Sequence, residues 1–244
     1  MSSGSALGAA PLRAGSVVIV APLLVGAVVL GLLGVVDGDR RLASALFYDV
    51  SLGHWLGHGS FWMEDLLHTG GRNIMRLIAV AALGAWLASV RVAWLTAHRR
   101  ALAYLASCFA LVPLLVGALK SVTGVDCPWD ITGFGGDRPY VEWFADRPDG
   151  LPQAACFPGA HSSSAFALFA LFFLWRGSRP LWARVALGVT VIVGALFSVA
   201  QQSRGAHFLS HDVASAMIAW AMCAGVHFWM FENQLMHGNE ARRV

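Results

Sequence analysis

Long apolar runs alternate with short polar segments along most of the chain. A helix needs about 20 predominantly apolar residues to cross a bilayer, and most of these runs reach or approach that length. The pattern therefore predicts an all-α, polytopic membrane protein. We expect six transmembrane helices, at residues 16–36, 75–95, 101–119, 162–175, 183–200 and 213–231.

The segments outside these runs divide into two tails and several polar connections. Residues 1–15 are small and polar, and we expect a disordered cytoplasmic tail there. Residues 42–74 mix aromatic and leucine residues with ionisable ones, which indicates an amphipathic helix at the membrane interface, followed by a turn at Gly70–Gly71. Residues 232–244 form a second cytoplasmic tail, so that 16–231 is expected to be one six-helix domain.

Composition supports a membrane protein and excludes several other classes. The chain is 57% apolar and 13% charged, whereas a soluble domain carries about 25% charged residues. A net charge of +3 is too small to indicate a nucleic-acid partner. The four cysteines form no CxxC pair, so no zinc ribbon is predicted.

The distribution of charge predicts the orientation. An even number of helices places both ends of the domain on one side, and we interpret the first run as a retained helix rather than a cleaved signal. The segments on that side carry two acids, Glu232 and Glu240, while the opposite loops carry the other twelve of fourteen. The positive-inside rule therefore places both termini in the cytoplasm, because that side holds Arg13, Arg99, Arg100, Arg176, Arg179, Arg184, Arg242 and Arg243.

Three polar stretches then meet on the outer side, near 120–140, 156–163 and 201–212. Cys127 and Cys156 lie in the same outer loop. An oxidising compartment permits a disulfide between them, and we favour that bond over two free thiols. Cys108 and Cys223 lie within predicted helices and are expected to be core residues.

The outer stretches contain the residue types that phosphoryl transfer requires. Fixed cations hold phosphate oxygens through charge-assisted hydrogen bonds, and arginine offers a forked pair of donors. One histidine can attack phosphorus while a second protonates the leaving oxygen. The candidates are Lys120, Arg138, His161, Arg204 and His207.

These stretches resemble the sequence pattern of the type 2 phosphatidic acid phosphatase superfamily, whose soluble relatives include vanadium-dependent haloperoxidases. That pattern has a lysine six residues before Arg-Pro, then Pro-Ser-Gly-His, then Ser-Arg, five residues, His, three residues and Asp. The matching segments here are Lys120 with Cys127-Pro128, Pro158-Gly159-Ala160-His161, and Gly205-Ala206-His207. The resemblance implies that His207 is the nucleophile and that His161 protonates the leaving group.

The resemblance also implies a phosphate-binding set, with departures from the family pattern. Cys127 and Gln201 stand where the family has arginines, so Arg138 and Arg204 are the expected replacements. Gly159 occupies the position of the family serine that contacts phosphate, so only its backbone N–H could donate a hydrogen bond to phosphate. Lys120 and Ser162 complete the expected set, although Ser162 can instead cap the following helix.

The expected aspartate is also displaced. His211 occupies its position, and Asp212 follows. One residue turns a helix by about 100°, so Asp212 can orient His207 only if the helix starts late or is irregular. A bacterial subgroup of the superfamily is similar in this region, with Cys-Pro-Trp-Asp and Gly-Ala-His-Phe-Leu-Ser-His-Asp, which favours a variant site over a dead one.

The sequence therefore predicts a metal-independent lipid phosphate phosphatase with a phosphohistidine intermediate, no cofactor and a lipid phosphate as partner. We expect it in a bacterial inner membrane, with the site facing the periplasm or exterior. Two alternatives use the same site: a lipid phosphotransferase, and a phospholipid-binding or transport protein without turnover. A third is a zinc site at His207, His211 and Asp212.

Overall fold

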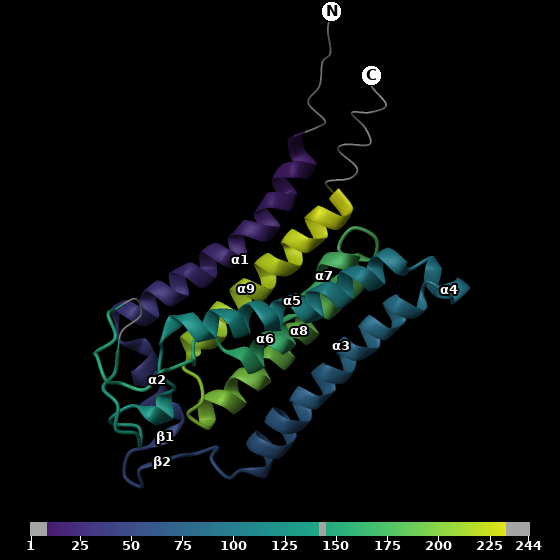
Figure 1. Cartoon of the computed structure of the whole chain (residues 1–244). Helices are drawn as coiled ribbons and strands as arrows, with labels where there is room; N and C mark the ends of the chain where they lie inside the picture. The colour runs from purple at the N-terminus through teal and green to yellow at the C-terminus, as the bar shows by residue number, and fades with distance from the viewer. Residues whose placement is uncertain (1–8, 142–144, 233–244) are drawn as a thin grey trace, which may run out of the picture.

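The computed structural model describes residues 9–141 and 145–232, and they form a mostly helical bundle (Figure 1). A short two-stranded antiparallel sheet pairs Tyr48 with Trp55. The remaining elements are helical. In chain order the elements are α1 Ala9–Val35, α2 Gly38–Leu46, β1 Tyr48–Asp49, β2 His54–Trp55, η1 Phe61–Gly70, α3 Gly71–Ala88, α4 Ala93–Thr96, α5 Arg99–Thr123, η2 Pro128–Asp130, α6 Ala160–Phe166, α7 Phe169–Trp175, α8 Pro180–Ser203, α9 Leu209–His227 and η3 Phe228–Glu232.

Four of the six predicted membrane helices are long and apolar enough to cross a bilayer. They are Ser16–Val35, Arg99–Asp130, Pro180–Ser203 and Leu209–Glu232. The other two predicted runs are helical as well. One is α3, and the other is a shorter apolar helix, Ala160–Trp175, in which α6 passes into α7.

Several boundaries differ from the sequence prediction. The helix expected at 75–95 ends at Ala88, and a separate short helix, α4, follows at Ala93–Thr96. The first helix starts at Ala9, inside the tail expected to be disordered; residues 1–8 and 233–244 of the two tails lie outside the described part. No turn forms at Gly70–Gly71, because both glycines are right-handed helical and the π-helix η1 continues directly into α3. Glycine permits a turn without requiring one, and here the chain stays helical from Phe61 to Ala88.

The long helices run roughly alongside one another (Figure 1). α1 packs against α9, α5 packs against both α9 and α3, and α8 packs against α6 and α7. The first turns of α1 and the end of α9 lie at one end of the bundle. The short elements α2, β1 and β2 lie at the opposite end, with the loop that follows α5 (Figure 1).

The largest buried cluster joins α5, α7 and α9. Tyr104 is fully buried and donates its hydroxyl hydrogen to the carbonyl oxygen of Cys223, at 2.9 Å. Cys108 and Cys223 are both buried in this cluster as free thiols, which confirms that they are core residues. Trp220 packs on Phe173 and Phe169 in the same cluster. This core fixes α5 and α9, which carry parts of the site described below.

A second cluster lies beneath the polar end of the bundle. Trp55 stacks on Phe134 and donates its indole N–H to the Phe134 carbonyl at 3.0 Å. Phe208, just before α9, packs into the same cluster. Asp39 of α2 is buried and accepts the backbone N–H of Ser210 at 3.0 Å, in the first turn of α9. A carboxylate at a helix start satisfies a free N–H group, so this layer positions the beginning of α9.

The three polar stretches converge as predicted. Cys127 and Cys156 form a disulfide, which confirms the expected bond. The N–H of Trp129 donates to the Gly205 carbonyl at 3.0 Å, and the N–H of Gly159 donates to the His211 carbonyl at 3.0 Å. These bonds tie the loop after α5 and the start of α6 to the segment between α8 and α9.

Candidate active site

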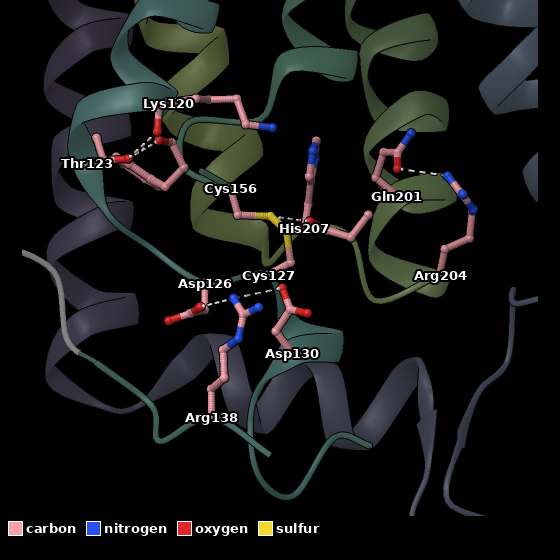
Figure 2. Close-up of a disulfide and its surroundings, with 12 residues drawn as sticks. Lys120, Thr123, Asp126, Cys127, Asp130, Arg138, Cys156, Gln201, Arg204 and His207 are labelled. Atoms are coloured by element: carbon pink, nitrogen blue, oxygen red, sulfur yellow. Dashed lines mark hydrogen bonds and ion pairs between the residues drawn. A yellow bond between two sulfur atoms is a disulfide. The ribbon is translucent and has the colours of Figure 1, made fainter. Parts of the chain in front are cut away.

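A cavity of about 430 Å³ opens where these stretches meet. Its lining comes from η1, α3, α5, η2, α6, α8 and the α8–α9 connection, and both disulfide cysteines contribute to the wall. Figure 2 shows Lys120 and His207 on one side of the disulfide and Arg138 on the other. The lining residues are His68, Arg72, Met75, Arg76, Ala79, Phe109, Pro113, Lys120, Cys127, Trp129, Cys156, Ala160, His161, Ser164, Gln201, Ala206 and His207.

His207 is held by a buried carboxylate. Its Nδ1 lies 2.8 Å from Oδ1 of Asp212. The other carboxylate oxygen, Oδ2, accepts a hydrogen bond from Nε2 of Gln202, also at 2.8 Å. His207 is 5% exposed and Asp212 is 2% exposed. An ionised carboxylate on Nδ1 fixes the tautomer that has its proton on that nitrogen, so Nε2 keeps the lone pair needed for nucleophilic attack.

The late start of α9 explains how this pair forms. Phe208 is extended, and the helix begins only at Leu209, so His207 lies in the preceding loop. Gly205 has φ +77°, a conformation that favours glycine, and a side chain there would meet the Trp55 ring. Because His207 is outside the helix, helical spacing does not govern its distance from Asp212.

His161 lies in the first turn of α6 and contributes its ring to the cavity. The ring stacks on Phe197 with 4.4 Å between centroids and lies 4.7 Å from the His68 ring. Its Nε2 is 3.3 Å from the carbonyl oxygen of Leu67. The structure therefore brings His161 and His207, from separate helical segments, to the same cavity.

Lys120 also lines the cavity, from the last turn of α5. In Figure 2 its side chain extends from α5 toward the His207 ring. No carboxylate of the described residues forms an ion pair with it. An ammonium group without an ion-pair partner in the described structure, beside a buried histidine, is suited to holding an anion.

Arg138 and Arg204 do not line this cavity, contrary to the expected replacement of the family arginines. Arg138 forms a 2.7 Å ion pair with Asp126, and that carboxylate raises the pKa of the guanidinium (Figure 2). Arg204 lies 3.4 Å from Glu64 and donates to the side-chain oxygen of Gln201 at 3.1 Å. Both guanidinium groups are already bonded to acceptors: Arg138 to Asp126, and Arg204 to Glu64 and to Gln201.

Gly159 and Ser162 likewise differ from expectation. The N–H of Gly159 donates to the His211 carbonyl, so it is not available for phosphate. The hydroxyl of Ser162 is fully buried and donates to the Gly159 carbonyl at 3.2 Å. Ser162 is not the helix cap that the sequence offered as the alternative, because Gly159 is the N-cap of α6 and forms no side-chain cap bond; the Ser162 hydroxyl instead stabilises the first turn from within the helix.

A side chain at Gly159 is expected to displace His207. A β-carbon there would lie 2.7 Å from Cε1 of His207 and 2.9 Å from Oδ1 of Asp212, closer than real contacts allow. A displacement of about 1 Å at a reacting group can reduce the rate about 100-fold. We therefore expect Gly159→Ala to lower the rate of phosphate release about 100-fold, measured on the purified protein in detergent.

The matched control for this change is Gly188→Ala in α8, where a β-carbon meets nothing within 4 Å. It should leave the rate within about twofold, since alanine also has the higher helix propensity. Native-like rates for Gly159→Ala would contradict the close packing of Gly159 against His207.

Sequence reasoning missed four cavity residues. His68, Arg72 and Arg76 recur every four residues, which places them on one side of the continuous η1–α3 helix. Gln201 is 2% exposed and hydrogen-bonds through Nε2 to Nδ1 of His68. The four-residue spacing of these ionisable side chains at the start of an apolar run was the signal available in the sequence.

His68 is held in its neutral form. Burial, together with the nearby charges of Arg204 and Arg72, lowers its pKa to about 4. A neutral ring can accept the Gln201 amide hydrogen on Nδ1. His68 therefore adds no fixed positive charge to the cavity at neutral pH.

His211 does not share the role of Asp212. Its ring is fully buried between Phe157 and Phe208, and neither ring nitrogen has a hydrogen-bond partner within the described part of the chain. Its centroid is 5.9 Å from that of His207. Among residues 9–141 and 145–232, no group of three or more His, Cys, Asp or Glu side chains is arranged to hold a metal ion, so the zinc alternative gains no support.

The fold and the cavity define a helical membrane protein with a buried histidine–aspartate pair facing a basic pocket. A family model described as the PAP2 superfamily matches residues 101–235, which is more than half of the chain. The chain therefore belongs to the PAP2 superfamily, whose members are phosphatases. Searches of curated proteins and of solved structures found no match to it.

Proposed function

We propose that this chain is an integral membrane lipid phosphatase that hydrolyses a phosphate monoester or diphosphate through a phosphohistidine. The observation that carries the proposal is the 2.8 Å bond between His207 and Asp212 at the wall of a basic cavity. Superfamily membership supports phosphatase activity on phosphate esters. A histidine whose Nδ1 is bound to carboxylate has one nitrogen left to react, and that nitrogen is the proposed nucleophile.

The proposed reaction has two steps. In the first, Nε2 of His207 attacks phosphorus, the bond from phosphorus to the leaving oxygen breaks, and His161 donates a proton to that oxygen. In the second, His161 takes a proton from water, the resulting hydroxide attacks phosphorus, and the phosphorus–nitrogen bond breaks to release inorganic phosphate. Asp212 stabilises the positive charge on His207 while the intermediate exists, and Lys120 offsets charge on the phosphate oxygens.

A lipid substrate is proposed from the shape of the cavity. Its charged lining lies near His207, while Met75, Ala79, Phe109 and Pro113 continue it between α3 and α5. Phe109 precedes Lys120 by 11 residues on the same helix, which corresponds to about 16 Å of rise. An apolar extension of this length next to a phosphate site fits a hydrocarbon chain.

We also propose that six helices cross the membrane, as one domain over 16–231, with the site on the outer face of a bacterial inner membrane. The arginine-rich connections and the acidic loops fall on opposite sides of such a bundle. The Cys127–Cys156 disulfide supports an oxidising compartment at the site. We include α3 and the α6–α7 segment among the membrane-crossing helices because both are helical and lie beside the four longer apolar helices.

The test is phosphate release by the purified full-length chain in detergent micelles that contain EDTA, across a panel of lipid phosphates. We expect release to continue in EDTA, because the proposed chemistry uses only side chains. Release that EDTA abolishes would contradict metal independence, and a native protein that acts on no lipid phosphate would overturn the proposed function. Adding an acceptor lipid separates hydrolysis from transfer, since transfer consumes substrate without releasing phosphate.

A further inference from the structure

The two family arginines are absent from their motif positions in this chain. Cys127 is bonded to Cys156, and Gln201 bonds His68 and Arg204. The nearby arginines, Arg138 and Arg204, are bonded to acids outside the cavity. Of the lysine and arginine residues in or near the motif segments, Lys120 alone belongs to the described cavity lining.

Two other arginines line the same cavity from α3. Arg72 and Arg76 are four residues apart, so they lie about 6 Å apart along the helix and on the same side of it. α3 packs against α5, which carries Lys120 (Figure 1). The three cationic side chains thus come from two adjacent helices and face one cavity.

None of these three cations forms an ion pair with a carboxylate of the described residues. None of the described residues that line the cavity is aspartate or glutamate. Neither Arg72 nor Arg76 forms an ion pair with a described residue. The Nε of Arg72 is buried and has no hydrogen-bond partner there. A buried guanidinium donor without an acceptor is costly, and an anion in the cavity would remove that cost.

We propose that Arg72 and Arg76, with Lys120, bind the nonbridging oxygens of the substrate phosphate in place of the two absent motif arginines. The identity of the substrate in this inference rests on the proposed function. The existence of an anion site is inferred separately, from the residues that line the cavity. Forked guanidinium donors match the oxygens of a phosphoryl group and offset the charge that builds on it. Three cations suit a terminal phosphate with two ionisable oxygens better than a singly charged phosphodiester.

The test compares Arg72→Gln, Arg76→Gln and the double variant with the native full-length chain in detergent. Loss of one preorganised donor at a reacting centre typically reduces the rate about 100- to 1,000-fold. We expect kcat/KM for phosphate release to fall by that factor in each single variant and further in the double variant. Inorganic orthophosphate should also inhibit the single variants more weakly. We expect its inhibition constant to rise about tenfold or more, because a hydrogen bond to a charged group is lost.

Arg91→Gln is the matched control, because Arg91 follows α3, is exposed, and lies outside the cavity lining. It should keep native kcat/KM. The charge-preserving variants Arg72→Lys and Arg76→Lys should keep more activity and tighter orthophosphate inhibition than the glutamine variants. Equal losses in the lysine and glutamine variants, with native thermal unfolding, would assign these arginines a role other than charge.

A binding measurement separates this inference from the proposed function. Equilibrium dialysis of radiolabelled orthophosphate against the native chain and the double variant reports the anion site without turnover. If the native chain hydrolyses lipid phosphates and the folded double variant retains native kcat/KM and phosphate binding, the inference fails and the function stands. If no lipid phosphate is hydrolysed but the double variant loses orthophosphate binding, the function fails and the anion site stands.

Discussion

His207→Ala should reduce phosphate release by at least about 10⁴-fold, the scale seen when a covalent nucleophile is removed. The expectation follows from the loss of the ring that Asp212 holds at the cavity wall. Alanine cannot form the phosphorus–nitrogen bond, and neither His161 nor His68 has a carboxylate partner among the described residues. Water would have to attack phosphorus directly, without the covalent intermediate.

The measurement combines turnover with trapping of the intermediate. Native protein quenched during reaction with a radiolabelled lipid phosphate should carry label that survives alkali and is lost in acid, as expected for a phosphorus–nitrogen bond. His207→Ala should carry none. His58→Ala is the control, because His58 is exposed and lies outside the cavity lining. Label retained in the His207→Ala chain would assign the nucleophile to another residue.

Asp212→Asn should lower kcat about 10²- to 10⁴-fold, because the amide keeps the size of the side chain but loses its charge. The carboxylate now accepts from Gln202 on one oxygen and pairs with His207 on the other. An amide at the same place can present its NH₂ to His207, which favours the wrong tautomer and leaves the phosphorylated ring without a counter-charge. The effect should appear in kcat more than in KM.

Two measurements distinguish this positioning role from a general loss of stability. Thermal unfolding of Asp212→Asn should stay near that of the native chain, and the fraction of label trapped as phosphohistidine should fall. Asp65→Asn, an exposed aspartate, serves as the matched control and should be unaffected in both. An Asp212→Asn chain with native kcat would contradict the proposed role of the pair.

The parts of the fold that depend on local sequence were predictable. A long apolar run is sufficient to indicate a membrane helix, because such a helix contacts lipid along its own length. Four of the six predicted runs have the length and hydropathy of a membrane helix. The Cys127–Cys156 bond was predictable because both cysteines fall in one loop on one side of the predicted bundle. The sequence could predict that Asp212 pairs with His207 only on the condition that the helix begins after His207. The structure meets that condition, because α9 begins at Leu209.

The cationic part of the site was not predictable in the same way. Arg204 and Glu64 are 140 residues apart, and Arg138 meets Asp126 only after the loop folds back on itself. Such pairings are set by tertiary structure, so proximity to a motif is a poor guide to where a guanidinium lies. Arg72 was missed because a glycine pair suggested a turn before it, whereas the helix continues through both glycines.

The disulfide has a consequence for biogenesis. Cys127 and Cys156 both belong to the cavity wall, and the Sγ of Cys156 lies 2.8 Å from the carbonyl oxygen of Ala206, the residue before His207. The bond forms only where thiols are oxidised. A newly made chain would thus complete its cavity after this end of the bundle has reached an oxidising compartment. Under the proposed orientation, a copy inserted with the opposite topology would keep both thiols reduced and would lack this link in its cavity wall.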